Sequence, residues 1–265
     1  LEGQEGSFAL DGGNLRAAEI RMNIPIWHAD GIAGAEATPL AGSVDIGRLD
    51  FPPMPEQSVS FPLQAIPDTI SIPAATTVRL PGGTARVGPV SVSDPFSKSM
   101  AAETEVSVNP TDIAPLLASA WPDMPESPLS GTLAPVVLQG GRIESGGQLT
   151  WEAFGGTIVL SELEVARALS SGPLVRVTAE LDDLILGKLT AGTAFGRIDG
   201  VLTGIIRNLE IAYGQPQAFD LLLETEQRKG VPQKISITAV ENIARIGGGR
   251  SPFMGLAGAF TTLFE

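Results

Sequence analysis

Apolar and polar residues alternate along several short stretches of the chain, and this period of two is typical of β-strands with one buried face. The alternation is clearest around residues 175–182 and again around residues 219–223. The apolar positions of these two stretches are Val175, Val177, Ala179, Leu181, Phe219, Leu221 and Leu223. Their spacing predicts strands of a meandering antiparallel sheet, with these seven side chains on the apolar faces of the strands.

Proline and glycine interrupt the alternating stretches. The chain has 265 residues, of which 31 are glycine and 21 are proline, more than an average globular protein contains. Such residues favour tight turns between short strands. We therefore expect a mainly β fold, built as an extended or curled antiparallel sheet with three or four short helices.

Helical spacing is confined to a few segments. Ile113 to Trp121 carries apolar residues at helical spacing, with Asp112 as the expected N-cap. The pattern Thr238-Ala239-Val240-Glu241 resembles a capping box and predicts a helix over 239–246. Further helices are expected over 252–264, where Pro252 occupies a first-turn position, and over 186–194.

The stretch Asp94-Pro95-Phe96-Ser97-Lys98 indicates an irregular connection near residue 100. We divide the chain there into a strand-rich part, 1–100, and a second strand-rich part with the C-terminal helices, 101–265. The two parts can also form one continuous domain.

Charge and composition exclude several classes of function. The formal net charge is −13, which opposes the phosphate backbone of nucleic acids. No apolar run is long enough to span a membrane as a helix, and the first residues lack the basic region of a signal peptide. The chain has no cysteine, so its stability is expected to need no disulfide.

The residues that enzymes use for proton transfer or metal binding are scarce. His28 is the only histidine, so neither a nucleophilic triad nor a zinc site of histidine and cysteine ligands can be assembled. The adjacent acids Asp182 and Asp183 could transfer protons, but a strand end leading into a helix cap is the simpler interpretation. We expect no enzymatic activity, no cofactor and no metal.

The glycine-rich stretch Gly247-Gly248-Gly249-Arg250-Ser251 precedes a predicted helix and could receive a phosphate at the free backbone N–H groups. It lacks the lysine of a nucleotide-binding loop. We interpret it as the end of one helix followed by the N-cap of the next.

Several glycine-rich strings of the chain resemble YdbH-like proteins of the AsmA/TamB group. The resemblance covers roughly residues 101–265. The strings are Phe195 to Gly204, Ala212 to Asp220, Ile235 to Gly249, Ser251-Pro252-Phe253, Pro128 to Leu133 and Glu152 to Thr157.

This resemblance implies a segment of a longer periplasmic protein that is anchored in the inner membrane and extends toward the outer membrane. Its sheet would curl into an apolar groove that holds phospholipid acyl chains during intermembrane transfer and outer-membrane biogenesis. The seven apolar residues named above are then the candidate groove lining. Some members of the group carry a dicarboxylate transport label, but this acidic chain lacks the basic cluster that two carboxylates would favour.

A different class of function remains open. An envelope scaffold could assist the assembly or export of outer-membrane proteins by pairing a sheet edge with a strand of its client. Bound phospholipid would favour transfer, whereas contacts with client strands and no lipid would favour the scaffold.

Overall fold

The computed structural model describes residues 2–9, 16–25, 38–50, 54–118, 124–168, 170, 172–191, 196–213, 215–231 and 233–240. These residues are mainly β, and most strands belong to one large antiparallel sheet. The predicted fold class is therefore confirmed. The irregular connection at 94–98 is confirmed too, since it separates two strands.

The chain forms two compact units. Unit 1 comprises residues 1–109 and 132–145, and unit 2 comprises 110–131 and 146–265. The units are interleaved because three long strands contribute residues to both. The expected division into 1–100 and 101–265 stays a prediction.

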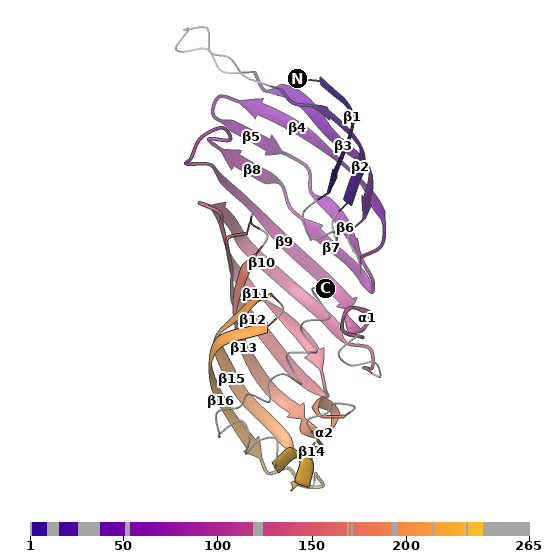
Figure 1. The fold of residues 1–265 in the computed structure, drawn as a ribbon, viewed down its shortest axis with the longest axis vertical. Coiled ribbons are helices and arrows are strands. Elements are labelled where there is room, and N and C mark those ends of the chain that lie inside the picture. Colours follow the sequence, from indigo (N-terminus) through magenta and orange to yellow (C-terminus); the bar gives the residue numbers. More distant parts are fainter. Residues whose placement is uncertain are drawn as a thin grey trace. The chain divides into compact units, whose positions relative to one another are not determined.

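The strands of unit 1 follow one another in hydrogen-bonded order from β1 to β5 and then to β8, while β6 pairs with β7 (Figure 1). Their bounds are β1 (Glu2–Ala9), β2 (Arg16–Asn23), β3 (Leu40–Asp50), β4 (Gln57–Ile66), β5 (Thr69–Ile72), β6 (Thr76–Leu80), β7 (Gly83–Val87) and β8 (Val90–Ser93). Strands shared between the units are β9 (Ala101–Asp112), β10 (Pro128–Gln139) and β11 (Arg142–Ala153).

Unit 2 continues with β12, β13, β15 and β16 as hydrogen-bonded neighbours, each antiparallel to the next. A separate two-stranded ribbon joins β14 to β17. The bounds are α1 (Ala114–Leu117), β12 (Gly156–Ala166), β13 (Leu174–Ile185), α2 (Leu186–Leu189), β14 (Ile198–Asp199), β15 (Val201–Ala212), β16 (Gln215–Glu226) and β17 (Lys234–Ile235).

The core of unit 1 is centred on β4. Alternate residues of this strand are buried, among them Val59, Leu63 and Ala65, while the residues between them are mostly exposed. The buried side chain of Gln57 accepts a hydrogen bond from the backbone N–H of Arg79 on β6 at 2.8 Å. This bond ties the β6–β7 hairpin to β4.

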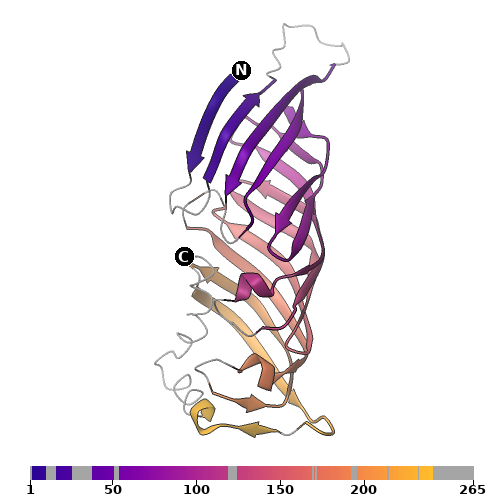
Figure 2. The ribbon, with the colours of Figure 1, turned by 90° about the vertical axis from the view of Figure 1, so that its right-hand side faces the viewer.

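The core of unit 2 lies where α2 and β14 cover one end of the sheet. Figure 2 shows the short helix and the β14–β17 ribbon at that end of the strands. The buried cluster joins Leu186 of α2 to residues of β11, β12, β13 and β15, and Leu184 is its least exposed member. Ile198 of β14 and Leu189 of α2 pack against it.

Two of the predicted helices are present, but each is short within the described residues. The expected helix at 113–121 is α1, and Pro115 lies in its first turn as predicted. The Asp112 carboxylate accepts hydrogen bonds from the N–H groups of Ala114, at 3.0 Å, and Ser127, at 2.8 Å. The N-cap residue of α1 is Ile113, so the prediction of Asp112 as N-cap is wrong by one residue, although its carboxylate satisfies a free N–H at the helix start. The expected helix at 186–194 is α2.

The helix expected at 239–246 begins earlier than predicted. Residues 237–240 are helical, and the hydroxyl of Ser236 accepts a hydrogen bond from the N–H of Ala239 at 3.2 Å. Ser236, rather than Thr238, therefore caps this helix. The rest of that helix, the helix at 252–264 and the glycine-rich stretch at 247–251 lie outside the described residues.

Truncation of the least exposed leucine tests the core of unit 2. Leu184 is 1% exposed, so Leu184→Ala should lower the free energy of unfolding by about 2–5 kcal/mol through lost burial and a cavity. The matched change Leu222→Ala, at a side chain that is 54% exposed, should cost less than about 1 kcal/mol. Urea titration followed by tryptophan fluorescence measures both, because Trp151 packs on this cluster. Equal losses would contradict the assigned core.

Candidate functional site

Apolar residues line one side of the sheet formed by β12, β13, β15 and β16, here called the apolar face. Paired residues of antiparallel strands project to the same side. One row of partners runs Leu160, Ala179, Ile206 and Leu221, and the next runs Ile158, Leu181, Gly204 and Leu223. The strand register thus places four of the seven predicted residues in two adjacent rows.

The other three predicted residues extend the same face toward the opposite end of the strands. Val175 pairs with Ile211, and Val177 pairs with Leu209. Phe219 alternates with Leu221 on β16 and lies opposite the residues between Arg207 and Glu210. The sequence pattern therefore grouped residues that share one face of the sheet.

Burial on this face is greatest on the inner strands near α2 and least on the edge strand β16. Ala179 belongs to the buried cluster, and Leu181 packs against it. Val175, Val177 and Phe219 are half-buried. Leu221 and Leu223 on β16 are 45% and 44% exposed. The face therefore combines a packed end with an apolar surface that is open to solvent near β16.

Three bulges keep the apolar residues on one side. The extra residues lie at Glu162 on β12, Asp183 on β13 and Asn208 on β15, and each has a positive φ between 50° and 57°. A bulge shifts the alternation by one residue. As a result Leu184 joins the side occupied by Leu181, although it would point the other way without the bulge at Asp183.

Sequence alternation missed the residues that follow these bulges. Leu184 and Leu209 both lie on the apolar face, yet each breaks the simple period of two. The only sequence signal for the shifted alternation on β13 and β15 is the residue type at the bulge, Asp183 and Asn208. Asp and Asn adopt the left-handed conformation more readily than most residues. Asp183 was interpreted as the end of a strand, but β13 continues to Ile185.

Gly204 leaves room in the second row of the face. A Cβ atom at this position would lie 2.3 Å from the backbone oxygen of Leu222 and 2.8 Å from the Cδ2 methyl of Leu223. The absence of a side chain lets the Leu223 side chain lean toward β15. A larger residue here would displace the edge strand.

The opposite side of the same strands is mixed, because one cross-strand row runs Val159, Glu180, Ile205 and Leu222 and the rows nearer the other strand end carry ion pairs. The guanidinium of Arg176 donates hydrogen bonds to Glu164 on β12, at 2.9 Å, and to Glu210 on β15, at 2.5 Å. These three side chains are half-buried and join three strands. The hydrogen bond to Glu210, followed by the charge of Glu164, raises the pKa of Arg176 above its usual value. The buried Thr178 donates a hydrogen bond to Glu162 at 2.7 Å.

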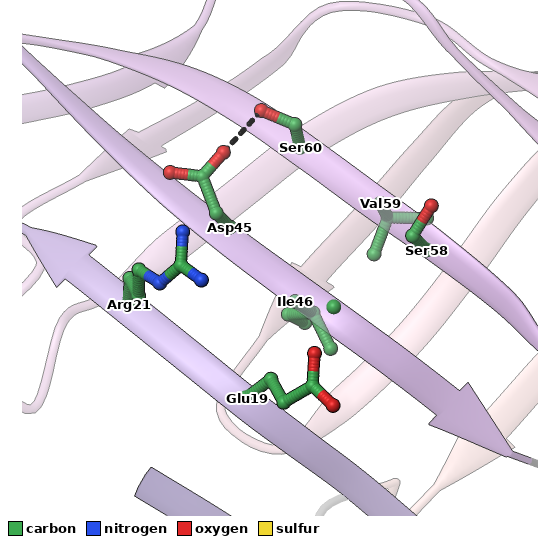
Figure 3. A pocket seen from close by; sticks show the side chains of 8 residues that line it. Glu19, Arg21, Asp45, Ile46, Ser58, Val59 and Ser60 are labelled. Carbon is green, nitrogen blue, oxygen red and sulfur yellow. Dashed lines mark hydrogen bonds between the residues drawn. The ribbon is translucent and has the colours of Figure 1, made fainter. Parts of the chain in front are cut away.

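Unit 1 contains a shallow hollow on the polar side of β2, β3 and β4 (Figure 3). Its volume is about 290 Å³, and Arg21, Asp45 and Ser60 line it in one cross-strand row. The Ser60 hydroxyl donates a hydrogen bond to Asp45 at 2.5 Å. The hollow is open, unlike the enclosed pockets that bind most small molecules.

The described residues include no group of three or more histidine, cysteine, aspartate or glutamate side chains that could hold a metal ion. His28 lies outside the described residues. Asp183 forms an ion pair with Arg228, which follows β16, so its carboxylate is occupied. In the part of the chain that the structure describes, no helix has the length and apolarity needed to cross a membrane.

Comparisons with models of protein families, with curated proteins and with solved structures found no match. The candidate site is therefore assigned from its own geometry: an apolar face with one packed end and one side that is open to solvent.

The ion pairs of Arg176 give a testable contribution to stability. Arg176→Gln leaves Glu164 and Glu210 facing each other across β13, so we expect a lower melting temperature in low salt. Because the raised pKa of Arg176 belongs to a base, its stabilising charge is present below the ordinary arginine pKa and is lost only as the pH rises through the folded value. The difference in melting temperature between Arg176→Gln and the unchanged protein should therefore stay constant from pH 6 to pH 9.

The matched control is Arg207→Gln, an exposed arginine on β15. Its melting temperature should stay within error of the unchanged protein. An equal effect of the two substitutions would show that the Arg176 ion pairs do not hold the strands together.

Proposed function

We propose that this chain is a lipid-carrying segment of a periplasmic bridge-like protein that transfers phospholipid between the inner and outer membranes. Phospholipid acyl chains would lie on the apolar face of unit 2, and the headgroups would project past β16. The full-length protein would be anchored in the inner membrane and would contact both membranes through parts outside this chain.

The observation that carries this proposal is the exposure of an apolar sheet face. A fully packed core would bury Leu221 and Leu223 as it buries Ala179, but both leucines are nearly half exposed. Apolar area in water costs about 25 cal/mol per Å², so acyl chains that cover these residues would be stabilised. The resemblance to YdbH-like proteins supports the same function, because a lipid groove and a periplasmic location are what that resemblance implies.

The two neighbouring leucines of β16 allow a sharp test. Leu221 lies on the apolar face, whereas Leu222 pairs with Ile205 on the opposite side of the sheet. Leu221→Arg should fold, because the arginine stem can lie along the open surface while its charge reaches water. It should lower the amount of co-purified phospholipid several-fold, as measured by native mass spectrometry of detergent-free protein.

Leu222→Arg is the control, since it adds the same charge one residue away on the opposite side of the strand. It should retain the lipid content of the unchanged protein. Loss of lipid in both variants, or phospholipid missing from the unchanged protein after gentle purification, would count against the proposal.

A second candidate function is supported by the edge position of β16. This strand of 12 residues pairs only with β15 among the described strands, and nearly all of its side chains are exposed. Unpaired backbone groups on such an edge can accept another strand. A scaffold for outer-membrane proteins could use this edge to hold a client strand during assembly or export.

Photo-crosslinking distinguishes the two functions. A crosslinker at Gln217 or Thr225 of β16 should capture strands of a β-barrel client if the edge serves as a scaffold. Crosslinks to lipid alone, with no client protein, would be consistent with lipid transfer and would contradict the scaffold function.

A further inference from the structure

Unit 1 has an apolar side of its own, built from cross-strand pairs as in unit 2. One row of partners crosses β3, β4, β5, β8 and β9 and is here called the unit 1 row. Its members are Leu40, Ala65, Ile70, Val92 and Ala102. The adjacent row, which projects from the other side of the sheet, contains Ala41, Gln64, Ser71, Ser91 and Glu103. The two sides of unit 1 therefore differ, since the unit 1 row has no polar side chain.

The unit 1 row is only partly covered. Leu40 is 41% exposed and Ile70 is half-buried, whereas Ala65 is 2% exposed. The corresponding row of unit 2 shows the same combination, because Ala179 is buried and Leu221 is exposed. In both rows a short alanine on an inner strand is buried, while larger apolar residues beside it remain in contact with water.

The apolar side of unit 1 continues along the strands. Met22, Val44 and Phe61 form another cross-strand row, and Val44 lies an even number of residues from Leu40 on β3, so both project to the same side. Met22 is 40% exposed, and Val44 and Phe61 are half-buried. Unit 1 thus presents apolar residues to solvent on several strands, and such a surface indicates a binding site.

The chemistry and length of the unit 1 row favour an acyl chain over a protein partner. A protein interface forms about one hydrogen bond per 100–200 Å², and the row has no polar side chain to form one. An acyl chain needs none. Strands about 4.8 Å apart give the five-strand row a span of about 19 Å. One leaflet of a bilayer, which is half of a hydrocarbon core of about 30 Å, holds acyl chains within about 15 Å.

We propose that unit 1 binds a phospholipid acyl chain of its own, which covers the unit 1 row. This inference rests on the proposed function, because the ligand belongs to the same class as the one assigned to the apolar face of unit 2. It adds a second site to that function, so the chain carries phospholipid on each unit. Four of the five residues of the row lie outside residues 101–265, the part that resembles YdbH-like proteins.

Site-specific photo-crosslinking tests the second site. Ile70 and Ser71 are adjacent and both half-buried, but they project to opposite sides of β5. The full chain, incubated with vesicles of phosphatidylethanolamine and phosphatidylglycerol, should crosslink to phospholipid several-fold more when the photo-reactive residue replaces Ile70 than when it replaces Ser71. Equal yields at the two positions, or no lipid at Ile70, would overturn the inference.

Two arginine substitutions show which side of β3 the lipid occupies. Leu40→Arg places a charge on the unit 1 row and should lower the crosslinking yield at Ile70 several-fold. The matched control Ala41→Arg adds the same charge at the next residue, which is also exposed and projects to the other side. It should leave the yield unchanged, and an equal loss in both variants would contradict the assigned side. Circular dichroism checks folding, and the comparison of Ile70 with Ser71 needs neither variant.

The substitution Leu221→Arg separates this inference from the proposed function. It removes lipid from the apolar face of unit 2, so crosslinking at Ile70 should persist at its original yield. Loss of the Ile70 crosslink in this variant would show that unit 1 has no separate site. Lipid at Leu221 without lipid at Ile70 would refute the second site and leave the proposed function, whereas lipid at Ile70 alone would refute the site on unit 2.

Discussion

The fold of unit 2 depends on one constraint: its sheet must bury an apolar side although only one end is covered by α2 and β14 within the described residues. Hydrogen bonds between the strands satisfy the backbone N–H and C=O groups of the inner strands. They do not remove the apolar side chains that project from the sheet from water. The covered end therefore becomes a packed core, and burial falls toward β16. The candidate site is the part of the face that this packing leaves open.

The three bulges keep the apolar residues of these strands on one side of the sheet and the ion-paired residues on the other. Glu162 on β12 and Asn208 on β15 lie across from neighbouring residues of β13, on either side of that strand. Bulges increase the local bend and twist of a sheet. Thr178 and Arg176 lie beside these bulges and bond to the flanking strands. Polar contacts on one side thus fasten the bend while the apolar residues stay together on the other.

Much of this arrangement could be predicted from the sequence. Alternation identified the β fold and grouped Val177 with Leu181 and Leu221 with Leu223 on one apolar side. It could not identify Leu184 or Leu209, because the bulges that reorient them depend on pairing with neighbouring strands. Burial could not be predicted either, since Ala179 and Leu221 follow the same local pattern and lie in one cross-strand row, but Ala179 is on the inner strand β13 and Leu221 is on the edge strand β16.

The helix at 237–240 shows the same limit at shorter range. Both Ser236 and Thr238 have a hydroxyl that can cap a helix, and the glutamate three residues after Thr238 favoured the later start. The pairing of β17 with β14 decides the outcome, because it brings Ser236 to the end of a strand where the chain must turn. The local sequence is compatible with a cap at either residue, and pairing with a strand distant in sequence determines that Ser236 is the cap.

The bulges also determine where the chain can change its length. Each is a single extra residue, so deletion of Asp183 would return β13 to strict alternation and turn every residue beyond it to the other side of the sheet. Substitutions inside these strands can be absorbed one side chain at a time, but a one-residue deletion reverses a whole strand end. The hairpin at Gly140 and Gly141 has no such restriction, since nothing lies within 4 Å of a Cβ atom added at either glycine. Changes in length are therefore expected to be tolerated at such turns and excluded from the strands.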